Sequence, residues 1–582
     1  MPWRKSLTKF CNFLIGITCF IVAFSLILEY GFHSGEFHFY LHRIQLFAAV
    51  FLILIYFIKL FLAPKPFTFL RNKRGYFALI IIFLTAAYLI DIYSPPKFII
   101  DFLERFPEVS PLIFVIQLYL ILFICLIFAN INQWINQLKG TILRPIIFIP
   151  VIFALIILVG TLLLLLPRAV HSGQENISFI DALFTATSAT CVTGLIVKGT
   201  GLYFSRLGQL IILALIQIGG LGIMTITTFF GLILGRQLGL REQAFLGEAL
   251  GNSAWHHVGR LVIKILLFVF LIEGVGAVLL YFQFLPYFGA IFHNLYLSVF
   301  HAVSAFNNAG FSLFADSFMA FKSHLGINLI ITSLIIIGGL GFPVIFDLFG
   351  WFGSKIKKEK RFLTLHSRTV LLATLILIIF GATLLFIFEN SRMSGENISH
   401  KILVSYFQSV TARTAGFNTI SIGWLAPPAA LILIILMFIG ASPGSTGGGI
   451  KTSAFATILV TIKSWLVGRP SVRLFKRSLA PIVIRQAFII FFLAILLIGL
   501  STLILSRTEK AGLLDIVFEE TSAFGTVGLS RGLTSNLTEI GKLVIIITMF
   551  LGRVGPLTLA IYLAQRGIVE KYKYPEDKVI VG

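Results

Sequence analysis

Long apolar runs alternate with short polar segments along almost the whole chain. Runs of membrane-spanning length lie at about 12–30, 43–63, 76–95 and 112–131, and eight more follow from about residue 145. Because about 20 apolar residues in a helix cross the hydrocarbon core of a bilayer, this pattern predicts an α-helical protein that crosses the membrane many times.

One pattern of segments occurs four times after residue 145. Each copy has a long apolar run, a short semi-polar segment with glycine, a second apolar run and a basic loop. The paired runs lie at about 145–167 and 206–234, 260–284 and 326–350, 368–388 and 428–461, and 484–506 and 538–564. We predict an all-α fold of four span–pore-helix–span repeats around a pseudo-fourfold pore. The expected boundaries are 1–140 for an N-terminal four-span region, then 141–240, 241–352, 353–468 and 469–582, the last including a cytoplasmic C-terminal tail.

The four semi-polar segments align on one glycine each. These are Gly194, Gly310, Gly416 and Gly528, which are 116, 106 and 112 residues apart. An aromatic residue stands ten positions before each glycine, and a small residue stands five positions before it. Since equivalent segments of internal repeats usually occupy equivalent places, we expect the four glycines to surround one axis.

Backbone carbonyls are the chemistry that these segments offer. Glycine adopts, without a Cβ clash, the backbone conformations that turn a carbonyl toward a water-filled path. Rings of carbonyls replace the hydration shell of the ion in potassium filters, and the negative ends of half-helices that run toward the centre favour a cation. The candidate filter residues, whose carbonyls would hold a potassium ion, are Cys191, Val192, Thr193, Gly194, Asn307, Asn308, Ala309, Gly310, Arg413, Thr414, Ala415, Gly416, Gly525, Thr526, Val527 and Gly528.

A glycine-rich break interrupts the second run of the third repeat, and no continuous helix tolerates so many glycines with a proline. It is the only second run with such a break, so we predict an intramembrane loop that gates the pathway. Arg553 stands where the other repeats have small residues, and an ionisable residue within a span is a functional candidate. The candidate gate residues are Gly440, Ala441, Ser442, Pro443, Gly444, Ser445, Thr446, Gly447, Gly448, Gly449, Lys451 and Arg553.

The chain resembles the membrane subunit of the Trk/Ktr/HKT potassium transporter superfamily, most closely its bacterial Ktr-like and Trk-like members. The four aligned segments, the glycine-rich break and Arg553 carry the resemblance, which runs from about 145 to 566. It implies a monovalent-cation pathway in each subunit, a homodimer, and a cytoplasmic ring that binds nucleotide and controls the gate. In the plant branch, a serine at the first filter glycine accompanies sodium preference. Gly194 therefore indicates that potassium is preferred.

This chain itself is expected to bind no cofactor, with potassium as the transported ion and sodium as a possible coupled ion. The segment from Gly444 to Thr452 is similar to a phosphate loop, but Ile450 separates the glycine from the lysine and no strand precedes it. No nucleotide site is predicted there. The nucleotide is expected on a separate regulatory subunit.

Composition and charge support a membrane protein. Hydrophobic residues make up 58% of the chain and charged residues 12%, against roughly 25% charged residues in soluble domains. The net charge of +22 comes from short basic loops, of which 351–368 and 463–485 hold six cations each. The positive-inside rule places these loops and both termini in the cytoplasm. We expect a multi-pass protein of the plasma membrane, which is the inner membrane in bacteria. Its expected partner is the lipid bilayer, and no binding of nucleic acid is expected.

The four apolar runs before residue 140 depart from the family, whose Ktr-like members lack extra spans and whose Trk-like members have two. Four spans before a pore resemble a voltage sensor, but the run from Pro111 to Asn130 contains no Lys or Arg, and a sensor needs several charges in the field. A structural or assembly role is the remaining interpretation.

Three alternatives to potassium uptake stay open. The protein could be a less selective or sodium-preferring monovalent-cation transporter, a membrane scaffold without a working pore, or an intramembrane enzyme. His301 is the main histidine near the predicted pore and has no evident catalytic partner, which disfavours the enzyme.

Several single residues have two interpretations. The glycines of the second runs, at Gly219 and Gly338, suit close helix packing as well as a pore role. Arg413 is expected to bind backbone carbonyls behind the filter. Glu519 and Glu520 are expected to brace the fourth half-helix.

Overall fold

The structure, a computed structural model, describes residues 2–31, 38–63, 76–81, 83–85, 118–119, 145–221, 258–359, 362–393, 395–469 and 471–555. Of the predicted N-terminal spans, the first two are the helices α1 (Pro2–Gly31) and α2 (His38–Leu62). The run at 76–95 is described only at 76–81 and 83–85, and the run at 112–131 only at 118–119. The second span of the first repeat beyond Leu221 and the chain after Gly555 lie outside the described residues.

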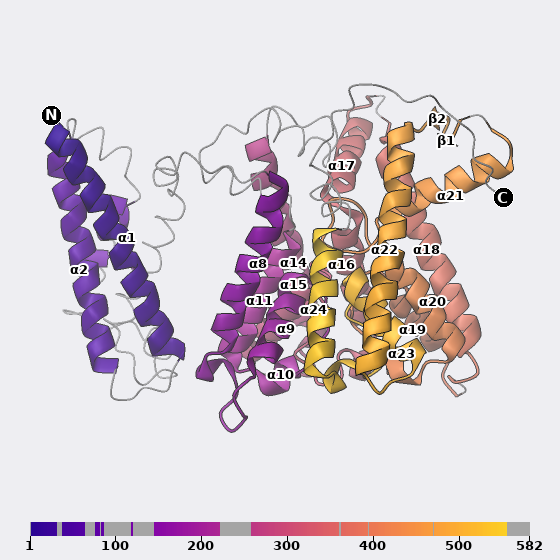
Figure 1. The fold of residues 1–582 in the computed structure, drawn as a ribbon, viewed down its shortest axis with the longest axis horizontal. Coiled ribbons are helices and arrows are strands. Elements are labelled where there is room, and N and C mark those ends of the chain that lie inside the picture. Colours follow the sequence, from indigo (N-terminus) through magenta and orange to yellow (C-terminus); the bar gives the residue numbers. More distant parts are fainter. Residues whose placement is uncertain are drawn as a thin grey trace.

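Helices make up nearly all of the regular secondary structure in the described residues, which confirms the predicted all-α class (Figure 1). The first span of each repeat is α8 (Pro145–Leu164), α14 (Val258–Phe284), α18 (Leu365–Glu389) or α22 (Pro481–Thr508). Among the described residues, five helices are long and apolar enough to cross a membrane, or six if one bent pair is a single span.

A short helix follows each first span and ends inside the bundle. These half-helices are α9 (Phe179–Thr190), α15 (Ile291–Phe306), α19 (Ile398–Thr411) and α23 (Leu513–Gly525). The second spans are α11 (Arg206–Gly220), α16 (Leu325–Leu340) continued by α17 (Phe342–Ile356), α20 (Pro427–Phe438) continued by α21 (Thr452–Leu466), and α24 (Glu539–Val554).

Small elements connect these helices. They are the α-helix α10 (Thr200–Tyr203), the 3-10 helices η1 (Pro167–Ala169), η2 (Met319–Phe321), η3 (Ile422–Trp424) and η4 (Thr534–Asn536), and the strands β1 (Arg473–Leu474) and β2 (Arg477–Ser478). The two strands pair in an antiparallel hairpin, with Arg473 opposite Ser478. This hairpin marks one end of the bundle, here called the hairpin end, and α10 lies at the opposite end (Figure 1).

The helices close into a ring of four repeats. Each second span packs against the half-helix of its own repeat or of the next one, and the contacts between neighbouring repeats are α11 with α15, α16 with α19, α20 with α23, and α24 with α9. The last contact joins the fourth repeat to the first. The ring is therefore closed around the ends of the four half-helices.

The second spans stop or bend near the middle of the bundle. The prediction that only the third repeat is interrupted is wrong, because α16 and α17 meet at a bend of 99°. Gly341 forms this bend with a φ of 87°, and Gly555 adopts nearly the same conformation, with a φ of 91°, after α24. A positive φ is costly for residues with a Cβ, so glycine at these two positions permits the chain to leave the helix.

Three buried or half-buried carboxylates fix the ends of helices at the α10 end. Asp181, in the first turn of α9, lies 2.6 Å from the Lys542 ammonium of α24, and Asp515, in the first turn of α23, lies 2.6 Å from Arg531. Glu509 accepts hydrogen bonds from the backbone and hydroxyl of Thr538, which caps α24. Acidic groups at helix N-termini complement the helix dipole, as expected for Asp181 and Asp515.

The N-terminal helices contact the first repeat through one described hydrogen bond. The Arg168 guanidinium, in η1, donates to the Glu29 carbonyl at the end of α1, over 3.0 Å. Within the pair, the Glu29 carboxylate accepts from Gln45 of α2. The described part of this region therefore has its own polar contacts as well as an apolar core.

Candidate functional site

The four aligned glycines meet at the centre of the ring, and all four adopt a left-handed backbone conformation. Their φ angles are 89° at Gly194, 70° at Gly310, 80° at Gly416 and 91° at Gly528. A Cβ added to each would meet a carbonyl oxygen of a neighbouring segment, in the order Ala309, Ala415, Val527 and Thr193. These contacts close a circle around the four repeats, so the four segments face one another as the fourfold sequence alignment predicts.

A second left-handed residue lies two positions before each glycine. The φ angles are 57° at Val192, 59° at Asn308, 80° at Thr414 and 51° at Thr526. Left-handed backbone is uncommon for residues with a Cβ and is strained for the β-branched ones. The glycine pattern of the sequence predicts left-handed backbone only at the four glycines and not at these four residues.

Hydroxyl groups at the ends of the half-helices hold the returning backbone. Ser188 donates to the Leu195 carbonyl over 2.7 Å, Ser304 to Phe311 over 2.8 Å and Thr411 to Phe417 over 2.7 Å. In the fourth repeat, the backbone N–H of Gly528 donates to Ser522 over 3.1 Å. These hydroxyl side chains are not among the residues predicted from the sequence. A hydroxyl six positions before three of the glycines, and five before Gly416, is the signal that finds them.

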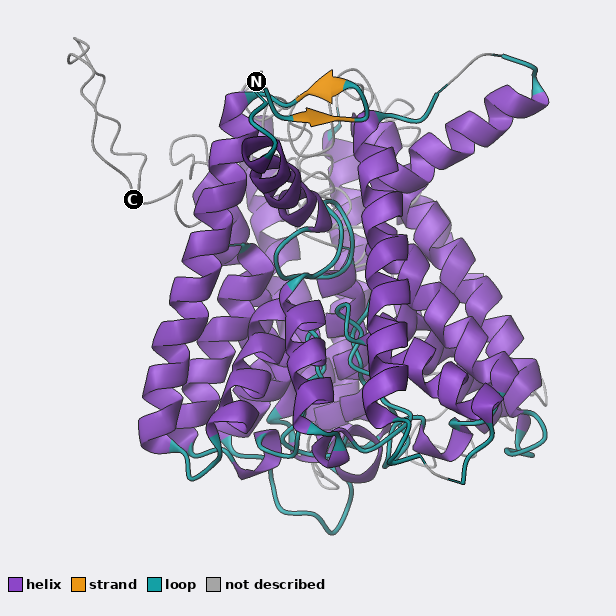
Figure 2. Ribbon diagram, turned by 90° about the vertical axis from the view of Figure 1, so that its right-hand side faces the viewer, coloured by secondary structure: helices purple, strands orange, loops and turns teal. Residues whose placement is uncertain are grey.

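The predicted gate residues from Gly440 to Lys451 form the loop between α20 and α21, and Arg553 lies in α24. Figure 2 shows non-helical segments among the helices in the middle of the bundle. Ser442 and Thr446 donate backbone hydrogen bonds to Gly339 and Gly338 of the second repeat, over 3.1 and 3.3 Å. The N–H of Gly448 donates to the Thr526 hydroxyl of the fourth repeat over 3.0 Å. Hydrogen bonds therefore join the loop to α16 of the second repeat and to the glycine segment of the fourth repeat.

Arg553 connects this loop to the first repeat. Its guanidinium donates to the carbonyls of Thr446 and Gly219 and is 8% exposed. Lys451 donates to the Gly447 carbonyl, within the loop, over 2.7 Å. Arg553 thus adds a link to the first repeat to the loop's contacts with the second and fourth repeats. Two cations, Arg553 and Lys451, lie against the loop.

The glycines of the second spans pack against the half-helices. A Cβ at Gly219, Gly338 or Gly552 would meet the carbonyl oxygen of Thr190, Phe306 or Phe524, each at the inner end of a half-helix. Of the two interpretations from the sequence, the structure favours close packing. Gly222, which belongs to the first of these patches, lies outside the described residues.

Two further expectations for charged residues have different outcomes. Glu519 is fully buried and accepts hydrogen bonds from Ser530, over 2.8 Å, and from Thr534, so it braces α23 against the loop that follows. Arg413 is 7% exposed, and its Nε has no hydrogen-bond partner among the described residues. No bond from Arg413 to a backbone carbonyl is found within the described part of the chain.

A buried polar cluster beside the second segment escapes the sequence analysis. Asn307, at the end of α15, donates to the Glu273 carboxylate of α14 over 2.8 Å, and Gln217 of α11 donates to the same carboxylate over 3.1 Å. Each residue lies in a different helix, so no sequence spacing indicates the cluster. It joins the first and second repeats next to the candidate filter.

These features define a class of protein: an α-helical membrane protein in which four half-helices and four non-helical glycine segments converge on one axis. A family model described as cation transport protein (TrkH) matches residues 117–571. The chain belongs to this family of cation transport proteins, and it is not an enzyme.

Curated relatives are similar over most of their length. The chain is 42% identical over 435 residues to the Ktr system potassium uptake protein B of Bacillus subtilis, covering 74% of this chain and 95% of the relative. It is 38% identical over 448 residues to the potassium/sodium uptake protein NtpJ of Enterococcus hirae, covering 76% and 98%. The crystal structure of the potassium transporter TrkH from Vibrio parahaemolyticus has the same fold, with a TM-score of 0.57 over 84% of this chain and 97% of that one, at 19% identity.

Proposed function

We propose that this protein takes up potassium through a central pathway whose selectivity filter is the ring of four glycine segments. The observation that carries the proposal is the closed circle of left-handed glycines and carbonyl-bearing neighbours. Carbonyls arranged around an axis can replace the water around a monovalent cation. The names of the relatives, potassium uptake and potassium/sodium uptake, support the same ion.

The intramembrane loop is the proposed gate. It lies between α20 and α21 and contacts the fourth glycine segment, and hydrogen bonds with Gly338, Gly339, Thr526 and Arg553 fix its backbone. A conducting state requires that these hydrogen bonds break or rearrange. The loop residues Gly440–Gly449 supply the flexibility for this change, since a positive φ at Gly444 and Gly449 already departs from helix.

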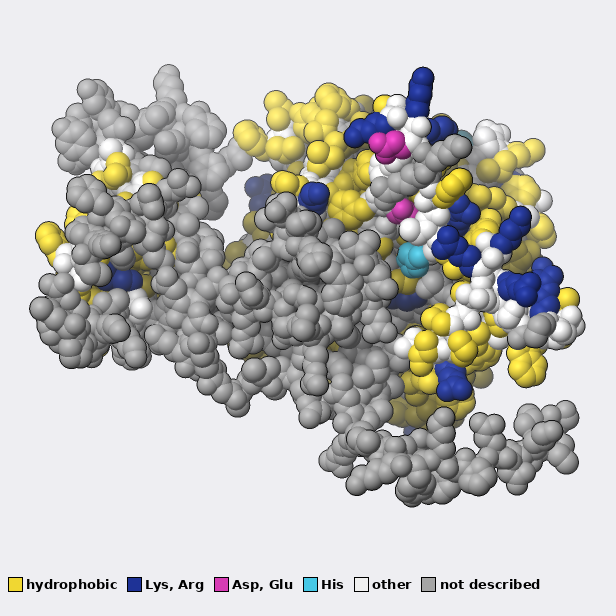
Figure 3. Space-filling view, turned by 90° about the horizontal axis from the view of Figure 1, so that it is seen from above, with side chains coloured by type: hydrophobic (Ala, Val, Ile, Leu, Met, Phe, Trp, Pro, Cys, Tyr) yellow, Lys and Arg dark blue, Asp and Glu magenta, His cyan; other side chains and the backbone are white. Residues whose placement is uncertain are grey.

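The hairpin end is the proposed cytoplasmic end. Basic side chains gather there over one side of the bundle (Figure 3), and they include Lys355, Lys357, Lys358, Arg469, Arg473, Lys476 and Arg477. By contrast, the segment 285–325 at the other end has only Lys322. The positive-inside rule then orients the hairpin end toward the cytoplasm and lets the four segments face the outside.

A second candidate function is uptake of both potassium and sodium. The similarity to the potassium/sodium uptake protein of Enterococcus hirae favours it.

Rescue of a potassium-uptake-deficient bacterium at low potassium, with and without sodium, tests the proposal of potassium uptake. Growth that depends on this protein supports potassium uptake, and a failure to rescue with the protein present in the membrane contradicts it.

A homodimer and a cytoplasmic nucleotide-binding regulatory ring are the proposed partners. Two relatives are named as proteins B and D of a Ktr system, which is consistent with further components. The basic loops 351–368 and 463–485 offer the ring a positively charged surface, although Lys360 and Arg361 lie outside the described residues.

Neutralising these loops is expected to weaken binding of the regulatory ring. Replacing Lys355, Lys357, Lys358 and Arg477 with glutamine removes four exposed cations, each worth about 0.2–1 kcal/mol in an exposed pair. We expect the affinity for the ring, measured with purified proteins, to fall by about tenfold and to depend less on salt. Lys401→Gln and Lys510→Gln, at the opposite end, serve as the control. Unchanged affinity in the loop variant would place the ring elsewhere.

A further inference from the structure

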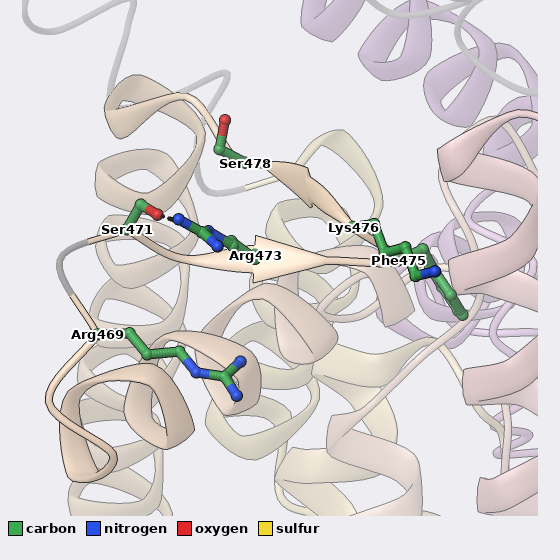
Figure 4. A pocket seen from close by; sticks show the side chains of 6 residues that line it. All are labelled: Arg469, Ser471, Arg473, Phe475, Lys476 and Ser478. Atoms are coloured by element: carbon green, nitrogen blue, oxygen red, sulfur yellow. Dashed lines mark hydrogen bonds between the residues drawn. The ribbon is translucent and has the colours of Figure 1, made fainter.

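A basic cavity lies at the edge of the hairpin end, outside the proposed pathway and gate. It has a volume of about 570 Å³ and is lined by Arg469, Ser471, Arg473, Phe475, Lys476 and Ser478. Figure 4 shows these side chains on the segment that joins α21 to the β1–β2 hairpin and on the hairpin itself. Three cations and two hydroxyl groups therefore surround one hollow.

The cations of this cavity have no carboxylate partner in the described part of the chain. The sequence itself contains no Asp or Glu between Glu396 and Glu509, and no ion pair among the described residues involves Arg469, Arg473 or Lys476. Arg473 donates from Nε to the Ser471 hydroxyl over 3.0 Å, which leaves the rest of its guanidinium for an anion. The cavity is thus suited to a phosphate-type group.

The neighbouring residues set the depth of the cavity relative to the membrane. Trp465 and Leu466, at the end of α21, are 80% and 83% exposed, and the apolar helix α22 begins at Pro481 with Ile482 exposed. Exposed tryptophan next to apolar helix surface is typical of the headgroup level of a bilayer. The cavity lies between these two apolar segments in the chain, and we therefore expect it at the level of the lipid phosphates.

The turn of the β1–β2 hairpin places an aromatic residue and a cation next to each other at the cavity. Phe475 and Lys476 occupy the two turn positions between β1 and β2, with φ angles of 47° and 63°. Paired positive φ angles are the geometry of a type I′ hairpin, which usually contains Asn and Gly. Here the turn instead presents an exposed aromatic ring beside a cation. A glycerophospholipid offers matching groups, an apolar glycerol and acyl region beside a phosphodiester.

We propose that this cavity binds the headgroup of an anionic phospholipid of the cytoplasmic leaflet, such as phosphatidylglycerol. Basic pockets on the cytoplasmic side of membrane proteins recognise anionic headgroups in this way. The site follows α21, the helix that begins directly after the gate loop, and it involves none of the filter or gate residues. It does not depend on which cation the protein transports.

The test uses the purified full-length protein and native mass spectrometry. The probe is phosphatidylglycerol in detergent, with phosphatidylcholine and inorganic phosphate in parallel arms. The cavity variant carries Arg469→Gln, Arg473→Gln and Lys476→Gln. The matched control carries Lys355→Gln, Lys357→Gln and Lys358→Gln, which removes the same charge from the same end of the bundle. Because the three cavity side chains are exposed, their replacement leaves the core intact.

Wild type and control are expected to retain at least one more phosphatidylglycerol per chain than the cavity variant. The affinity of the cavity variant should fall by about 100-fold, from about 1 kcal/mol for each of the three cations near the surface. Equal retention by the cavity variant, or an equal loss in the control, overturns the site. Equal retention of phosphatidylcholine, or displacement of the lipid by inorganic phosphate, overturns the assignment of its ligand. If the triple variant does not fold, the single variants Arg469→Gln and Arg473→Gln decide by the same readout.

Discussion

Replacing Gly194 with serine is expected to reduce potassium flux by about tenfold or more, and to reduce it more than sodium flux. Gly194 has a φ of 89°, and a Cβ there would meet the carbonyl oxygen of Ala309 and come within 3.1 Å of the Gly310 Cα. Left-handed strain alone costs on the order of 1–3 kcal/mol. The first and second segments must therefore separate or rotate, and an altered ring replaces the hydration shell of the larger ion less well.

Gly199→Ser is the matched control for this experiment. Gly199 lies five residues further along the chain, precedes α10 as its N-cap, and a Cβ there would meet only the Leu202 Cβ, at 3.8 Å. Serine is a favourable N-cap residue, so this variant should transport as wild type does. The measurement is uptake of each ion into proteoliposomes with equal protein content. An equal fall of both fluxes in Gly194→Ser would contradict a role in selectivity.

Replacing Arg553 with alanine is expected to raise potassium flux by at least about tenfold. Arg553 is the described link between the gate loop and the first repeat, through the carbonyls of Thr446 and Gly219. Hydrogen bonds to a charged group contribute about 1.5–3 kcal/mol, and their loss shifts the loop toward open arrangements by that amount. The substitution also removes a positive charge that repels cations below the filter.

Arg507→Ala provides the control, because Arg507 is an exposed arginine in the last turn of α22, far from the loop. Shortening the loop within Gly440–Gly449 should act in the same direction as Arg553→Ala. Single-turnover uptake at equal expression distinguishes opening from a change in protein amount. Unchanged or lower flux in well-expressed Arg553→Ala would show that the loop is not the gate, while the filter proposal would stand.

The four glycine positions were predictable because the sequence repeats them in register. Glycine tolerates positive φ, so a glycine at the same place in four copies indicates a shared backbone conformation. The left-handed residues before them were not predictable, since Val192 and Thr526 are β-branched and oppose that conformation. The backbone N–H groups of Thr193 and Val527 donate to the carbonyls of Ser188 and Ser522, five residues earlier. These bonds close the C-terminal end of the half-helix around a left-handed residue, as in a Schellman motif, where glycine or asparagine is the usual residue.

The bend between α16 and α17 also has a signal in the sequence. Gly341 follows Gly338 and Gly339 and is followed by Pro343, at the start of α17, so glycines with a proline indicate a break here as they do in the third repeat. The contact of this bend with the gate loop, where the N–H of Phe342 donates to the Gly444 carbonyl over 3.1 Å, provides the partner that the bent backbone needs. The cluster of Glu273, Gln217 and Asn307 could not be predicted from the sequence, because its members come from three helices that only the fold brings together.

The ion preference of the wild-type protein tests the central claim most directly. Purified protein in proteoliposomes, with potassium, rubidium or sodium as the only permeant cation, gives the three uptake rates under one gradient. A ring of four glycine segments with intact carbonyl geometry predicts that potassium and rubidium enter faster than sodium. Sodium uptake as fast as potassium uptake would contradict the account and would place the protein among general monovalent-cation pathways.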